Sequence, residues 1–140
     1  MNRENIYAAL FTLASSPPGL VTKSRKLLHW NDVGPGEMPA LFQAQGNETL
    51  VKPAANGLPS VWMLEATLYL YVRTEGQSPG PVLNPLLDAI TAKFDANVIG
   101  VPQTLGGLVQ WARIEGTIET SEGTLGDTEV ALIPVRMLAS

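Results

Sequence analysis

The sequence has no cysteine and only one histidine, His29, among its 140 residues. The absence of cysteine excludes disulfides, thiolate metal sites and a cysteine nucleophile, and it fits a reducing compartment. A zinc site needs three or four ligands, and a chain with one histidine and no cysteine lacks the usual ones. No run of about 18 or more apolar residues occurs, so the sequence predicts no membrane-spanning helix.

Charge is also scarce, since charged residues make up 16% of the chain and the net charge is -4. The only basic cluster is Lys23, Arg25 and Lys26, which we expect at a solvated strand edge. Nucleic-acid-binding domains usually carry a basic patch, so this composition argues against one. The apolar fraction of 45% is typical of a globular protein, and the length predicts one domain over residues 1–140.

A catalytic or metal site would have to include His29, with Asp32 and Glu37 close behind it. These groups could orient a water or contribute to a hard-cation site, but the spacing is not that of a calcium loop. No serine lies in a G-x-S-x-G pattern, and LGGLVQ at 105–110 is not a dinucleotide fingerprint. We therefore predict no catalytic residue, no metal ligand and no cofactor, and expect His29 and Trp30 to end a strand. A small hydrolase or metal-dependent enzyme centred on His29 stays an alternative.

Hydrophobic periodicity predicts the order of elements. The N-terminal segment has the apolar spacing of an amphipathic helix, and residues 61–73 alternate, with every even position apolar. The predicted fold class is α+β: a mixed, mainly antiparallel sheet of four to five strands with two helices packed on one face. The expected elements are a helix over 3–14 capped by Asn2, strands over 20–29, 40–48, 61–73, 109–120 and 129–138, and a helix starting at Asn84–Pro85 or near Pro81.

The last predicted strand, residues 129–138, is apolar on both faces and is expected to be central, although Pro134 favours an edge or a bulge. Residues 49–60 read as a loop, mobile in part, with Lys52, Asn56 and Gly57 as candidates for its mobile portion. The carboxylates around the 121–128 turn are expected to be exposed; they are Glu115, Glu119, Glu122 and Asp127.

Aromatic and arginine side chains gather on the mixed faces of two predicted strands. Tyr, Trp and Arg are the residue types most enriched at interface hot spots. Alternatively, these rings sit under a helix as a second layer of core. The candidate interface residues are Tyr69, Tyr71, Arg73, Trp111, Arg113 and Glu115.

Several segments resemble, in order, the tail-terminator or tail-completion proteins, minor tail proteins of phages with long non-contractile tails. They are MNRENIYAALF, HWNDV followed by EMPALFQAQG, VWMLEATLYLYVR, LNPLLDAITAKF, TLGGLVQWARIEGTIE and LGDTEVALIPVRML. The resemblance spans nearly the whole chain and lies in an arrangement of elements rather than in a catalytic signature. Glu37, Pro39 and Ala40 match the D/E-x-P-A step into a strand and are expected to be structural.

The resemblance implies a structural virion protein at the head-proximal end of the tail, assembled in the host cytoplasm. Such a subunit forms a ring, expected to be hexameric, which caps the tube, stops its polymerisation and offers an interface for head attachment. The implied partners are other copies of the chain, the major tail tube protein and head-completion or connector proteins. DNA would pass through the lumen without specific binding, and no membrane is involved. A ring closed by head-to-tail contacts needs two different patches on each subunit. A head–tail connector or neck protein is the alternative within this class.

Overall fold

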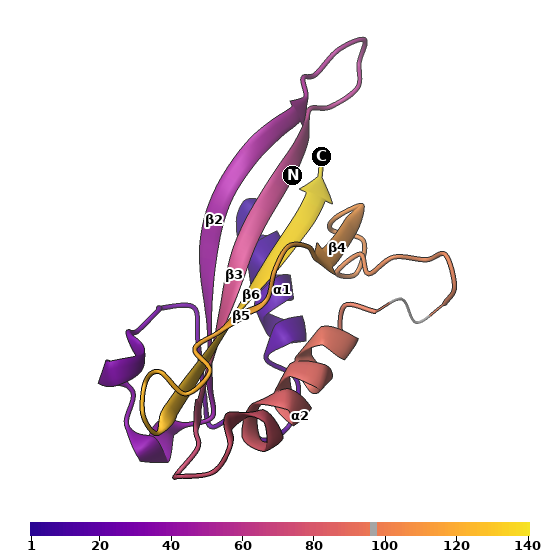
Figure 1. Cartoon of the computed structure of the whole chain (residues 1–140). Coiled ribbons are helices and arrows are strands. Elements are labelled where there is room, and N and C mark those ends of the chain that lie inside the picture. The colour runs from indigo at the N-terminus through magenta and orange to yellow at the C-terminus, as the bar shows by residue number, and fades with distance from the viewer. Residues whose placement is uncertain (96–97) are drawn as a thin grey trace.

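The computed structural model describes residues 1–95 and 98–140, which form two helices and a six-stranded sheet (Figure 1). The sheet is mixed, because β1 pairs parallel with β2 while every other pairing is antiparallel. The elements are α1 (Arg3–Ala14), β1 (Thr22–Ser24), the 3-10 turns η1 (Trp30–Asp32) and η2 (Pro35–Glu37), β2 (Ala40–Lys52), β3 (Val61–Arg73), α2 (Pro79–Ala92), β4 (Trp111–Ile114), β5 (Glu119–Thr120) and β6 (Thr128–Ala139). The predicted α+β class is confirmed, with more strands than the four to five expected.

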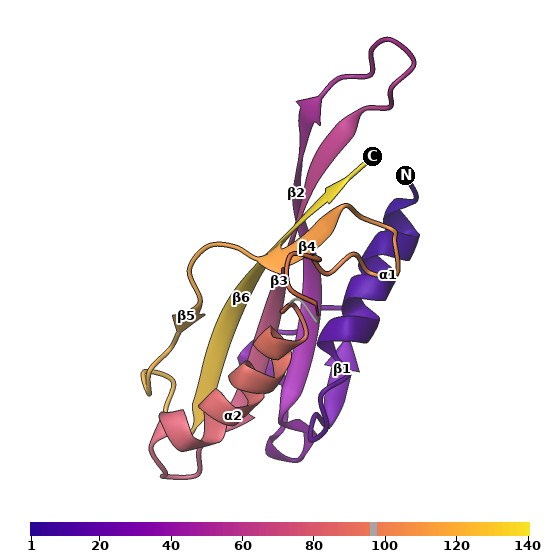
Figure 2. The same cartoon turned by 90° about the vertical axis from the view of Figure 1, so that its right-hand side faces the viewer.

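Both helices pack on one face of the sheet (Figure 2). The strand order is β1-β2-β3-β6-β4, with β5 also paired to β6, so the last strand is central as predicted. The even positions of β3 supply the middle of the core, where Leu64, Leu68 and Leu70 are fully buried. α1 adds Ile6, Tyr7, Leu10 and Ala14, and α2 adds Leu83 and Ile90.

The predicted strand over 109–120 is interrupted, which explains the sixth strand. Pro134 of β6 lies opposite the gap between β4 and β5, and its carbonyl accepts the N–H of Glu115 at 3.2 Å. Because the N–H and C=O of a strand residue point to the same side, the donor that Pro134 lacks would face this gap. Gly116 turns the chain here with φ +122°, and an added Cβ would meet Pro134 Cγ at 3.2 Å.

The hairpin of β2 and β3 is longer than predicted, because β2 continues to Lys52 instead of ending at residue 48. Placing residues 49–52, including Lys52, in a loop was therefore wrong. Only the tip is a turn, where Asn56 and Gly57 have positive φ and Ala55 and Leu58 exchange backbone hydrogen bonds. Asn-Gly is the preferred pair for such a two-residue turn. A bulge after Gln45 lets the strands twist as they extend beyond the rest of the molecule (Figure 1).

One other boundary differs from the prediction, and a second is decided between the two predicted positions. Only Thr22–Ser24 of residues 20–29 forms a strand; His29 is the N-cap of η1 and Trp30 its first residue, so neither ends that strand. α2 begins at Pro79, with Ser78 as its N-cap, close to the predicted alternative near Pro81, so Asn84 is not a cap and Pro85 lies inside the helix. Prolines are tolerated in the first helical turn, and the early start buries Leu83 against the sheet.

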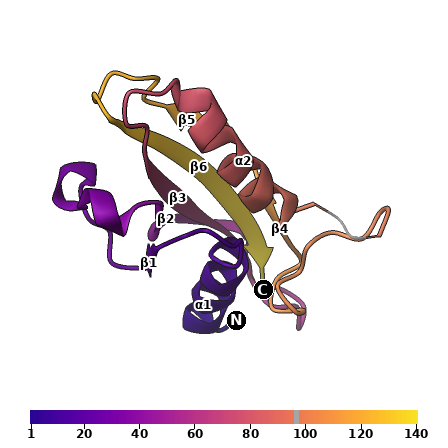
Figure 3. The same cartoon turned by 90° about the horizontal axis from the view of Figure 1, so that it is seen from below.

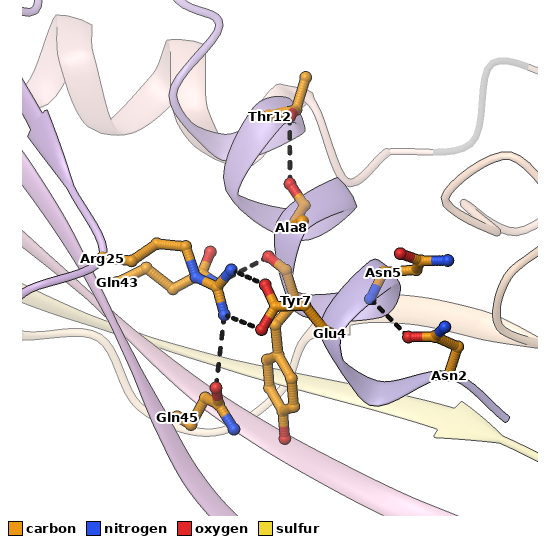
Figure 4. A network of polar contacts seen from close by, with 9 residues as sticks. All are labelled: Asn2, Glu4, Asn5, Tyr7, Ala8, Thr12, Arg25, Gln43 and Gln45. Atoms are coloured by element: carbon orange, nitrogen blue, oxygen red, sulfur yellow. Dashed lines mark hydrogen bonds and ion pairs between the residues drawn. The ribbon is translucent and has the colours of Figure 1, made fainter.

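The helix α1 is held on the sheet by polar contacts as well as by its apolar face (Figure 4). The amide of Gln43 donates to the carbonyl of Tyr7 at 2.9 Å, and the guanidinium of Arg25 binds Glu4. Asn2 caps the helix as predicted, since its side chain accepts the N–H of Asn5. Two further contacts join α1 to the hairpin: the side chains of Arg3 and Tyr7 both donate hydrogen bonds to the carboxylate of Glu48 on β2.

Candidate interaction surface

The His29 segment is organised as a pair of capped turns. Nδ1 of His29 accepts the N–H of Asn31 at 3.1 Å, and the carboxylate of Glu37 accepts the N–H of Gly34 at 3.0 Å. These bonds satisfy backbone donors at the start of η1 and η2, so each side chain caps the turn to which it belongs. Within residues 1–95 and 98–140, no three His, Asp or Glu side chains are arranged to hold a metal ion.

The same segment covers part of the second face of the sheet, the face without helices (Figure 3). Its side chains pack on those of β2 and β3 in a group that we call the second cluster: Val33, Met38, Ala40, Phe42 and Tyr71, with Trp30, Tyr69 and Val130 partly buried against it. The Phe42 and Tyr71 rings lie 5.4 Å apart between centroids in a tilted arrangement. Ala40 is fully buried, and the carbonyl of Pro39 accepts N–H groups of Val21 and Thr22.

Tyr71 is therefore a core residue, with 3% of its surface exposed. Its hydroxyl donates to the carbonyl of Leu28 at 2.7 Å, which fixes the covering segment to β3. Burial, with a smaller contribution from Tyr69, raises the pKa of Tyr71 from 10.0 to about 12. Of the residues proposed for an interface, Tyr71 belongs to a second layer of core, as the alternative predicted, but the segment with the 3-10 turns covers it instead of a helix.

The other half of the second face carries no helix or 3-10 turn of the described residues, and the segment from Gly116 to Glu119 borders it. Register places Trp111 beside Leu138, and Arg113 beside Arg136, which in turn lies beside Glu65 of β3. We call this half the open surface: Glu65, Trp111, Arg113, Glu115 and Arg136. The structure thus brings together Trp111, Arg113 and Glu115, as their alternation in the sequence predicts.

Charged groups on the open surface form a connected network. The guanidinium of Arg113 lies 3.8 Å from the centroid of the Trp111 ring and donates to Glu115 at 3.0 Å. Arg136 joins the network through Glu65 at 3.2 Å and Glu115 at 3.7 Å. These pairs are partly exposed, so they hold the side chains in a defined arrangement while adding little to stability.

Arg73 lies apart from this network, at the end of β3. It is half-buried, and its Nε has no hydrogen-bond partner among the described residues. Tyr69 lies between the two halves of the face and lines a hollow of about 420 Å³, together with Leu27, Leu28, Trp30 and Leu132. A second hollow of about 210 Å³ lies beside Trp30 and is bordered by Glu119 and Leu125.

Sequence reasoning missed Glu65 and Arg136 as members of the surface. Glu65 is the only acidic residue of β3, and Arg136 is the only charge in the second half of β6. Opposite charges on two strands of one face are a signal for cross-strand pairing, but the register was needed to place them side by side. Three apolar side chains near the hairpin tip are also exposed: Leu50 at 45%, Val51 at 55% and Leu58 at 59%.

Comparison with known proteins gives no matching family model and no matching curated protein. Within the described residues, no helix is long and apolar enough to cross a membrane. The functional conclusion therefore rests on the geometry of the surface and on the resemblance seen in the sequence.

Proposed function

We propose that this chain is a structural subunit of a phage tail, of the terminator type, which works by assembly rather than by chemistry. As a ring, it would cap the tail tube, stop its polymerisation and provide the interface for head attachment. The observation that carries this proposal is the open surface, where an ordered group of Trp, Arg and Glu side chains lies on a sheet face without helices.

This surface has the composition of an interface rather than of an ordinary solvated sheet. Trp and Arg supply contact area and directional hydrogen bonds, and they are concentrated at interface hot spots. The network also positions the side chains before binding, so contact would cost less side-chain entropy. The projecting β2–β3 hairpin, with exposed Leu50, Val51 and Leu58, adds a second contact element that extends away from the sheet.

The proposal is tested by electron microscopy of particles from a phage that lacks this protein. We expect tails of uncontrolled length that are not joined to heads, because nothing ends tube growth. Normal virions would disprove the proposed function. Supplying Trp111→Ala with Arg113→Ala in trans is expected to leave the same defect, whereas Asp88→Ala, on the exposed side of α2, should restore normal tails.

A further inference from the structure

The two lateral edges of the sheet carry opposite charge. At one edge, Lys23 of β1 and Lys26 just after it are exposed; we call them the basic edge. At the other edge, Glu119 of β5 and two residues of the following loop, Glu122 and Asp127, are exposed; we call these three the acidic edge. Figure 2 shows β1 and β5 on opposite sides of the molecule.

None of these five side chains forms an ion pair within the part of the chain that the structure describes. The neighbouring Arg25 is different, because it is half-buried and bound to Glu4 of α1. On the open surface, Arg136 and Glu115 are likewise paired. Exposed charges such as Lys52, Asp88 and Lys93 also form no ion pair among the described residues, but they lie on the hairpin and at α2 rather than at either edge. Unpaired like charges gathered at one edge repel each other, and an opposite edge on a partner would neutralise them.

The two edges also lie at the same level of the sheet. The register leads from Lys23 to Leu41, Leu70, Ala131 and finally Thr120 of β5, in one row across five strands. Glu119 is the adjacent residue of β5, so it follows the neighbouring row and faces the second side of the sheet, whereas Lys23 faces the helix side. Four steps between neighbouring strands place the two edges about 19 Å apart, so they do not meet within one chain. A second copy placed beside the first at the same level would bring its acidic edge against the basic edge.

We propose that copies of this chain associate side by side, with the basic edge of one copy against the acidic edge of the next. This contact is heterologous, since it joins two different patches, and repeating it generates a ring or an open chain. That the association closes into a ring rests on the proposed function, whereas the contact between the two edges does not. Edge-to-edge association leaves the open surface and the hairpin free to bind the tail tube or the head proteins.

The first test joins the edges chemically. Isotope-labelled and unlabelled chains are mixed at high concentration and treated with a carbodiimide, which couples amines directly to carboxylates that touch them. We expect mass spectrometry to find labelled–unlabelled peptide pairs linking Lys23 or Lys26 to Glu119, Glu122 or Asp127. Absence of such pairs, or links confined to other residues, would overturn the proposal.

The second test reverses the charge of each edge, with association followed by sedimentation velocity. The variants Lys23→Glu with Lys26→Glu, and Glu119→Lys with Glu122→Lys, should each weaken self-association by at least about tenfold. An equimolar mixture of the two variants should restore association, because every contact then joins opposite charges. The chain carrying all four substitutions, which keeps the net charge of -4, should also associate.

A matched control separates edge contact from total charge. Lys52→Glu with Lys93→Glu makes the same change in net charge as Lys23→Glu with Lys26→Glu, from -4 to -8, at exposed positions away from both edges. This control should associate like the unsubstituted chain, and far-ultraviolet circular dichroism should be unchanged in every variant. Association that survives reversal, or is not restored by mixing, would refute the edge contact even if phage tails require the protein. Conversely, confirmed edge pairing with normal tails in the deletion phage would reject only the proposed function.

Discussion

The two halves of the second sheet face have the same alternating sequence pattern, but their aromatic side chains differ in burial. In the covered half, Trp30, Val33 and Met38 pack over Phe42 and Tyr71, and the rings become core. In the open half, Trp111 lies under the guanidinium of Arg113 and stays at the surface. Alternation along a strand therefore identifies the face that a side chain occupies, but not what covers that face.

The difference comes from the connection that follows β1. That segment contains two short 3-10 turns, each closed by its own side-chain cap, which carry Trp30, Val33 and Met38 onto the sheet. Beside β4 the described residues include no comparable connection on this face, and the loop that contains Gln103 bonds to the outer edge of the strand at Ala112. Local capping thus determines which half becomes a second core and which half can bind a partner.

The largest expected effect is the loss of packing in the covered half. Phe42 is 1% exposed, and Phe42→Ala should lower the free energy of unfolding by about 3–5 kcal/mol, because it removes a ring and leaves a cavity. Chemical denaturation monitored by circular dichroism measures this change. The matched variant in the open half, Trp111→Ala, should cost about 1 kcal/mol or less, and equal costs would contradict the distinction between the halves.

Much of this fold was accessible from the sequence. The even positions of β3 are an unbroken apolar series, so the helix-covered core was predictable from periodicity alone. The break between β4 and β5 was not predictable, because it depends on Pro134 of β6 lying directly beside Gly116 in the gap. The start of α2 was predictable only as a choice between Asn84–Pro85 and an earlier position near Pro81, since several prolines permit a helix start and the burial of Leu83 favours the earlier one.

The candidate surface was predictable in part. Trp111, Arg113 and Glu115 share one face because they alternate along a single strand, and this requires no tertiary information. Tyr71 has the same alternation, but whether it is exposed depends on a segment some 40 positions earlier in the chain, whose contact is a hydrogen bond to the Leu28 carbonyl. Such a long-range contact has no local pattern in the sequence.

A smaller effect should follow from the hydroxyl of Tyr71. Tyr71→Phe keeps the ring but leaves the carbonyl of Leu28 without its donor, so stability should fall by about 1 kcal/mol. Thermal and chemical unfolding measure this loss. Tyr69→Phe is the matched control on the same strand, and it should be nearly neutral. A larger loss for Tyr69→Phe than for Tyr71→Phe would show that the covering segment is not held through Tyr71.

Because the Tyr71 hydroxyl is buried, we also expect the stability of the fold to decrease at alkaline pH. Burial raises the pKa of Tyr71 to about 12, so the folded state favours the neutral phenol, whereas the unfolded chain ionises at the ordinary value of 10.0. This contribution to stability is complete below pH 10 and is lost as the pH rises through about 12. Burial and the nearby Glu48 carboxylate raise the pKa of Tyr7 as well, so some loss will persist without Tyr71. Tyr71→Phe should show a shallower fall in stability over this range, and an unchanged slope would contradict the buried state of the phenol.

The smallest expected effect on stability belongs to the ion pairs of the open half. Arg136 is partly exposed and pairs with Glu65 at 3.2 Å and Glu115 at 3.7 Å. Arg136→Gln keeps most of the stem and removes the charge, so it should lower the free energy of unfolding by only about 0.2–1 kcal/mol, and added salt should reduce the difference further. Denaturant titrations of both chains at low and high salt measure this. A loss as large as that of Phe42→Ala would mean that the network stabilises the fold like a core, and the open surface would then have a structural role rather than one in binding.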